Sequence, residues 1–167
     1  WDCSNWGRIW KRGLVMRYQQ AFTLVELIIV VTIIAILIAI AYPSYTSYQI
    51  RTQRASAQTE MIDIARNLSN YKLANYNYAG RTVSNVFGRS TIPLGKPLYD
   101  VVLTDVNRNP LTASNANVRT WLLIATPKSG TNQFGNGVIC LNDQGQRFWA
   151  KGATACSLSA TSTWDGR

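Results

Sequence analysis

The feature that most constrains this chain is a run of 21 residues, from Phe22 to Tyr42, in which Glu26 is the only charged side chain. At about 1.5 Å of rise per residue, a helix over this run would be roughly 31 Å long, which matches the hydrocarbon core of a bilayer. By the positive-inside rule, the basic residues before the run place the N-terminus in the cytoplasm and the rest of the chain outside it. These basic residues are Arg8, Lys11, Arg12 and Arg17.

Helical periodicity continues beyond Pro43, although a proline inside a helix removes one hydrogen bond and bends or breaks the axis. Apolar side chains recur at steps of about three and four residues, and Arg54 is the one charged member of the stripe. The apolar members are Ile50, Ala57, Met61, Ile64, Leu68 and Tyr71. We predict one long helix from about residue 23 to 74, kinked near Pro43, whose second half packs on a sheet.

The remainder of the chain predicts strands. Residues 75–97 are rich in Asn, Gly, Ser, Thr and Pro, which favours an irregular connection. The strand-like runs are 98–104, 119–126, 137–141 and 146–150. The last two flank Asn142-Asp143-Gln144-Gly145, which has the composition of a β-hairpin turn. The predicted class is therefore α+β, with a long N-terminal helix packed on an antiparallel sheet of three to four strands.

The start of the apolar helix carries a recognisable motif. It reads Gln20-Ala21-Phe22-Thr23-Leu24-Val25-Glu26 and follows a short basic segment. This junction resembles the processing site of type IV prepilins, in which a membrane peptidase cuts before an aromatic residue and methylates the new amine. The resemblance implies cleavage between Ala21 and Phe22 and N-methylation of Phe22. One departure is Ala21, because the family nearly always has glycine there.

The resemblance divides the chain into three parts. Residues 1–21 are the leader, 22–43 the transmembrane and filament-core half of the helix, and 44–167 an extracytoplasmic pilin head. The first methionine is Met16, so we expect synthesis to start there and residues 1–15 to come from upstream translation. The resemblance also implies that the precursor lies in the inner membrane and that the processed subunit enters an extracellular pilus.

Glu26 is a charge at membrane depth. A carboxylate there costs about 2.5–3.5 kcal/mol near a helix centre and less toward the end, so something must offset its desolvation. In a bundle of parallel helices with offset registers, Glu26 can meet the free amine of Phe22 on a neighbouring subunit, where the low dielectric strengthens the attraction. We therefore predict that Phe22 and Glu26 form an assembly contact.

The chain has three cysteines, Cys3, Cys140 and Cys156. Cys3 lies on the cytoplasmic side of the apolar run, whereas the other two lie where disulfides persist. We predict one bridge, Cys140 with Cys156, which stabilises by about 3 kcal/mol in the chain-entropy model. In pilins the corresponding loop is exposed and serves adhesion or partner contact. The tail beyond Cys156 is mostly small and polar, and we expect it to be loose unless Trp164 docks.

Composition disfavours an enzyme. The sequence has no histidine, which is the commonest general base and metal ligand, and no Cys-x-x-Cys pair. It also lacks a Gly-x-Ser-x-Gly motif, a phosphate-binding glycine loop and an evident carboxylate pair. We predict no catalytic residues, no cofactor and no metal.

The charge balance leaves a DNA-binding role open. Residues 22–167 carry 13 basic and 7 acidic side chains, a net charge of +6. Some minor pilins with a cysteine pair and tryptophan bind DNA during uptake, and this chain is similar to them in outline. Arg147 and Lys151 are candidates for phosphate contacts, and Trp149 for a stacking surface. The alternative is a basic surface that is merely solvated.

The first functional hypothesis is a structural subunit of a type IV pilus, more specifically a minor pilin. Its partners would be other pilin subunits, the prepilin peptidase and the inner membrane, with DNA or a host surface as further candidates. The second hypothesis is a DNA-binding minor pilin. The third is a pseudopilin of type II secretion, ranked last because its common major member has an acidic calcium loop and no disulfide. This chain has only Asp143 and Asp165 near its end, and it has two cysteines there.

Overall fold

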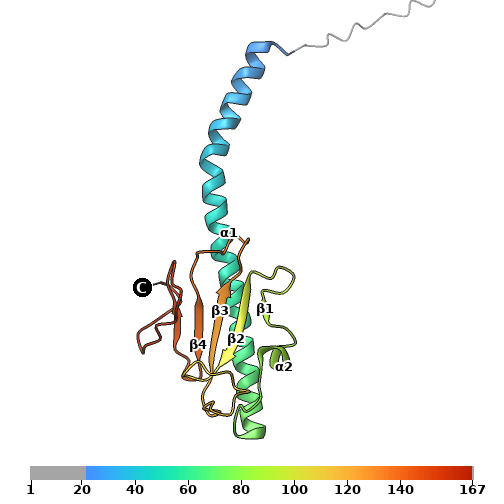
Figure 1. Ribbon diagram of the computed structural model, residues 1–167. Coiled ribbons are helices and arrows are strands. Elements are labelled where there is room, and N and C mark those ends of the chain that lie inside the picture. Colours follow the sequence, from blue (N-terminus) through green and yellow to red (C-terminus); the bar gives the residue numbers. More distant parts are fainter. Residues whose placement is uncertain (1–21, 167) are drawn as a thin grey trace, which may run out of the picture. The chain divides into compact units, whose positions relative to one another are not determined.

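In the computed structural model, the described residues are 22–166. They divide into two units, one ending at Tyr42 and one beginning at Pro43, and helix α1 (Leu24–Asn75) contributes to both (Figure 1). The predictions that concern Cys3, Met16 and Ala21 fall outside the described residues.

The first unit is the apolar beginning of α1. Its side chains are exposed all round, and an 18-residue window reaches a mean hydropathy of 3.2, so the helix is long and apolar enough to cross a membrane. Thr23 caps it, because its Oγ1 accepts a hydrogen bond from the backbone N–H of Glu26 at 3.2 Å. The backbone carbonyl of Thr23 accepts a second bond, from the N–H of Leu27 at 3.1 Å.

Helix α1 continues through Pro43 and is 52 residues long. The expected span of about 23 to 74 is therefore confirmed to within one residue at each end. The carbonyl of Pro43 accepts a hydrogen bond from the hydroxyl of Thr46 at 3.0 Å. A kink at Pro43 stays a prediction.

The second unit is built on an antiparallel sheet whose strands follow one another in chain order. In Figure 1 the strands lie beside the second half of α1, and the α+β class is confirmed. The register pairs Val101 with Ala125, Ile124 with Cys140, and Cys140 with Phe148. The strands are β1 (Thr91–Ile92), β2 (Tyr99–Thr104), β3 (Leu122–Pro127), β4 (Ile139–Asn142) and β5 (Arg147–Trp149).

The sheet has one strand more than the predicted three to four, and the extra strand corrects our reading of residues 75–97. That segment contains the two-residue β1 and the short helix α2 (Val83–Phe87). A reciprocal capping box between Thr82 and Asn85 starts α2, and Gly88 ends it with φ of 81°. Elements this short have no measurable hydrophobic period, so composition alone suggested a loop.

The core lies between the second half of α1 and the sheet. Ala57, Met61, Ile64 and Leu68 are fully buried, which confirms the predicted apolar stripe. Burying a large side chain of this kind contributes about 1.5–3 kcal/mol. The whole core cluster falls between Ala57 and Trp164, so the unit from Pro43 contains its complete core, sheet and disulfide. We therefore expect residues 43–167 to fold without the preceding apolar helix.

A buried carboxylate organises the long connection between β2 and β3. Asp105 accepts hydrogen bonds from the backbone N–H groups of Asn109 at 2.7 Å and Asn117 at 2.8 Å, and from the Asn109 side chain at 3.2 Å. Burial acts to raise the pKa of Asp105, but these hydrogen bonds outweigh it and the pKa is lowered. The loop thus depends on an ionised Asp105.

Candidate functional site

The expected assembly residues lie at the exposed start of α1. The side chain of Phe22 is 78% exposed, and Glu26 stands in the first helical turn, where the positive end of the helix dipole favours a carboxylate. An apolar helix surface exposed all round requires lipid or other helices to cover it. Contact between Phe22 and Glu26 of different subunits remains a prediction.

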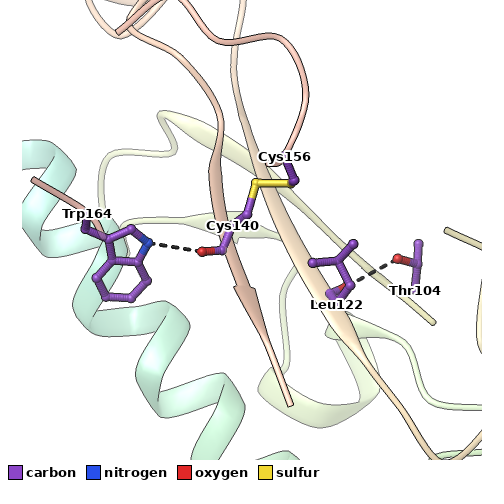
Figure 2. Close-up of a disulfide and its surroundings, with 5 residues drawn as sticks. All are labelled: Thr104, Leu122, Cys140, Cys156 and Trp164. Atoms are coloured by element: carbon purple, nitrogen blue, oxygen red, sulfur yellow. Dashed lines mark hydrogen bonds between the residues drawn. A yellow bond between two sulfur atoms is a disulfide. The ribbon is translucent and has the colours of Figure 1, made fainter. Parts of the chain in front are cut away.

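The disulfide starts from β4, the strand next to the edge strand β5. Cys140 in β4 is joined to Cys156, with their Cα atoms 5.9 Å apart, inside the usual range for a bridge (Figure 2). Cys140 is fully buried, so the bridge fastens the segment after β5 onto the sheet. The pairing predicted from the sequence is present in the structure.

The C-terminal tail is docked through Trp164. The indole N–H of Trp164 donates a hydrogen bond to the carbonyl of Cys140 at 3.1 Å, as Figure 2 shows. Nearby, the backbone N–H of Trp149 donates to the carbonyl of Thr163 at 3.1 Å. The disulfide and these two bonds therefore hold the tail from both ends.

The residues predicted to contact DNA separate into two places. Arg147 is exposed, and its guanidinium lies 5.0 Å from the ring centroid of Trp164. Trp149 is only 9% exposed, because the guanidinium of Arg54 lies 3.5 Å from its ring centroid. Its indole N–H also donates to the carbonyl of Asn136 at 3.0 Å. Little of the Trp149 ring is left for a base, so the geometry does not favour stacking there.

Arg147 and Trp164 share a polar pocket with a volume of about 640 Å³. The amide nitrogen of Gln58 at this pocket is buried, and no residue in the range 22–166 gives it a hydrogen-bond partner. The lining is mostly amides and hydroxyls, which can both donate and accept hydrogen bonds. The main lining residues are Gln58, Gln144, Gln146, Arg147, Ser162, Thr163, Trp164 and Asp165.

A second hollow, which we call the basic pocket, has a volume of about 210 Å³. Three of its seven lining residues within the described range are cationic, and none of the seven is acidic. Burial lowers the pKa of Arg54, Tyr99 partly opposes this, and the nearby charge of Arg51 lowers it further. The pocket is lined by Ser47, Ile50, Arg51, Arg54, Asn136, Trp149 and Lys151.

Sequence reasoning found Trp149 and Lys151 of this pocket but missed Arg51 and Arg54. A signal for Arg54 was available, because it is the one charged residue in an otherwise apolar helical stripe. In the part of the chain that the structure describes, no cluster of three His, Cys, Asp or Glu side chains could hold a metal ion.

The long apolar N-terminal helix, the antiparallel head and the C-terminal disulfide together define a type IV pilin. Residues 16–42 match the family described as "Prokaryotic N-terminal methylation motif". Residues 43–142 match the family described as "Type IV minor pilin ComP, DNA uptake sequence receptor". This second match covers more than half of the chain, and the chain belongs to that family. The predicted resemblance to type IV pilins is confirmed.

Curated relatives agree with the family. The chain is 43% identical over 79 residues to the type IV major fimbrial protein FimA of Dichelobacter nodosus, and 54% identical over 46 residues to a fimbrial protein of Pseudomonas aeruginosa. These matches cover 45% and 28% of this chain, and 49% and 30% of the relatives. The type IV wide pilus major component PilA4 of Thermus thermophilus is 27% identical over 116 residues, 69% of this chain and 87% of the relative. The chain thus aligns with less than half of the first two relatives' length.

Proposed function

We propose that this protein is a structural subunit of a type IV pilus, of the minor pilin kind. The observation that carries the proposal is a methylation motif over residues 16–42 followed directly by the minor pilin match over residues 43–142. The apolar, fully exposed start of α1 supports it, because this surface fits first an inner membrane and then the core of a filament. The role is one of assembly and contact rather than catalysis.

The mechanism of assembly follows from the start of α1. The peptidase cuts between Ala21 and Phe22, which frees the amine of Phe22. In the filament core, Glu26 of one subunit faces this amine on the next, and the low dielectric makes the pairing strong and sets the register. Other pilin subunits, the prepilin peptidase and the inner membrane are the partners this scheme requires.

Removing the carboxylate tests the scheme. The full chain with Glu26→Leu should be processed and inserted into the membrane, but its amount in sheared pili should fall at least tenfold. A matched control, Ile29→Leu, changes the same apolar surface without a charge and should assemble normally. Normal recovery of Glu26→Leu in pili would refute the docking role.

A second candidate function is DNA binding, which the family description and the net positive charge support. Arg147 is the best placed of the three expected residues, because it is exposed and paired with an aromatic ring. Lys151 is also exposed, but it belongs to the basic pocket. A host surface remains a further possible target, and the pseudopilin role stays the last-ranked alternative.

Salt dependence tests DNA binding. A fragment of residues 43–167 should bind duplex DNA at low salt, with an affinity that falls steeply as salt rises. Arg147→Gln should reduce the slope of log affinity against log salt by about 1, if Arg147 neutralises one phosphate. Arg119→Gln, which removes an exposed charge elsewhere, is the matched control. No retention at low salt would eliminate this function.

A further inference from the structure

The basic pocket gathers three cationic side chains from distant parts of the chain. Arg51 and Arg54 come from one face of α1, and Lys151 follows the end of β5. Arg54 is half-buried and fixed over the ring of Trp149, whereas Arg51 and Lys151 are exposed. The pocket therefore combines one guanidinium held over an aromatic ring with two exposed cations that a ligand can reach.

Among residues 22–166, none of these cations forms an ion pair. The ion pairs found within residues 22–166 are Arg66 with Asp63, Arg89 with Glu60, and Lys128 with Asp100. The lining residues in the described part of the chain also include no aspartate or glutamate. Neighbouring like charges in a partly desolvated site repel, and a bound anion relieves that repulsion. The site thus favours an anionic ligand with several oxygen acceptors, such as a phosphate.

The pocket is close along the chain to the membrane-spanning run. Ser47, its first lining residue, comes five residues after Tyr42. Arg51, the first of its cations, comes nine residues after Tyr42 within the same helix, which corresponds to about 14 Å of helical rise. Before assembly, this short connection keeps the pocket close to the membrane surface, where the headgroup layer extends roughly 5–7 Å beyond the hydrocarbon core.

Exposed tyrosines support this placement. Tyr42, Tyr45 and Tyr48 are 68%, 64% and 69% exposed, although they are large and partly apolar. Tyrosine is enriched where a membrane helix meets the headgroups, because its ring is apolar and its hydroxyl is polar. Arg51 follows Tyr48 within one helical turn, and long helical side chains lean toward the N-terminal end, here toward these tyrosines.

We propose that the basic pocket binds the phosphate of an anionic phospholipid in the outer leaflet of the inner membrane and holds the head there before the subunit enters a pilus. This inference rests on the proposed membrane-anchored precursor. A pocket of about 210 Å³ has room for a flexible headgroup but not for a DNA duplex. The lipid is released when the subunit leaves the membrane.

Vesicle binding tests the proposal on the fragment of residues 43–167. The fragment should bind vesicles of phosphatidylglycerol and not vesicles of phosphatidylcholine. The double variant Arg51→Gln/Lys151→Gln should bind phosphatidylglycerol roughly 25-fold more weakly, at about fivefold for each charge. Arg108→Gln/Arg119→Gln removes the same net charge outside the pocket, and its affinity for phosphatidylglycerol vesicles should fall much less. Equal losses in the two double variants would overturn the proposal, because they would indicate attraction to net charge alone.

The indole N–H signal of Trp149 in a heteronuclear NMR spectrum reports on the pocket directly. It should shift when short-chain, soluble phosphatidylglycerol is added, and Arg51→Gln/Lys151→Gln should abolish the shift while melting like the parent fragment. No shift, or a shift with duplex DNA but not with the lipid, would overturn the lipid assignment. Both measurements use the isolated head, so a failure of pilus assembly does not affect them.

Discussion

The hydroxyl of Tyr99 in β2 donates a 2.7 Å hydrogen bond to Oε1 of Gln133, and both side chains are fully buried. The same Oε1 accepts from the side chain of Asn136 at 2.7 Å. The Gln133 amide nitrogen donates to the carbonyl of Ile50 at 3.0 Å and to Oε1 of Gln53 at 3.1 Å. Gln133 therefore links Tyr99 of β2 to the turn of α1 that contains Ile50 and Gln53. This part of α1 also lines the basic pocket.

Removing this link should destabilise the head. Gln133→Leu leaves the buried hydroxyl of Tyr99 without its acceptor, and an unsatisfied buried group of this kind costs about 1–3 kcal/mol. Denaturant unfolding of residues 43–167 measures the loss. Gln144→Leu, at an exposed position whose side chain forms no hydrogen bond to any residue in the range 22–166, serves as the control. Equal unfolding midpoints for the two variants would show that the link contributes nothing.

The head should lose stability at high pH because Tyr99 is buried as a neutral phenol. Burial raises the pKa of Tyr99 from 10.0 to about 12. The folded state therefore favours the neutral phenol, so its contribution is fully present below pH 10 and is lost as the pH rises toward 12. Tyr99→Phe should remove this component of the pH dependence, whereas Tyr76→Phe, at a position 85% exposed, should retain it. The measurement is unfolding free energy against pH; identical curves for the two variants would contradict the assignment.

Asp105 should make the stability of the head depend on pH in the acidic range. Its folded-state pKa lies below the ordinary value of 3.8, so its contribution is present above that value and is lost as the pH falls through the folded pKa. Asp105→Asn should lower the unfolding free energy at neutral pH. In this variant the unfolding free energy should also fall less as the pH is lowered, which is the part of the curve we call the acid limb. Asp143→Asn, at an exposed turn position, is the control and should keep the limb. An unchanged acid limb in Asp105→Asn would argue against an ionised, hydrogen-bonded carboxylate.

The disulfide should stabilise the head and keep the tail docked. Cys140 and Cys156 are 16 positions apart, and a loop of this size corresponds to about 3 kcal/mol in the chain-entropy model. Cys140→Ala/Cys156→Ala should lower the unfolding free energy by that order and should increase hydrogen exchange around Trp164. Thr161→Ala, within the same tail, should change neither quantity. If the double alanine variant keeps the parental unfolding free energy and the parental hydrogen exchange around Trp164, the bridge has no role in holding the tail.

Much of the fold could be predicted because the strong signals are periodic. The apolar run and the stripe from Ile50 to Tyr71 fit a helical pattern, and the four longer strands fall in short runs rich in apolar residues that turn residues separate. α2 and β1 could not be found this way, since they have five and two residues and depend on Thr82, Asn85 and pairing with β2. Local periodicity carries no information at that length.

The candidate sites were less predictable, because they depend on tertiary contacts. Arg147, Trp149 and Lys151 lie within five residues of one another in the sequence but line two different pockets, and Arg54 covers the ring that the sequence suggested for stacking. Nothing in the sequence of β5 alone places Arg54 beside Trp149. The disulfide was predictable because only two of the three cysteines lie on the oxidising side of the apolar run.

Mass spectrometry of the protein recovered from sheared pili shows whether this chain is processed as a prepilin and built into a pilus. We expect an N-terminal peptide that begins at N-methylated Phe22 and an intact mass that includes the Cys140–Cys156 bridge. A protein that is absent from the pili, or that retains Ala21 and an unmethylated N-terminus there, would contradict this expectation.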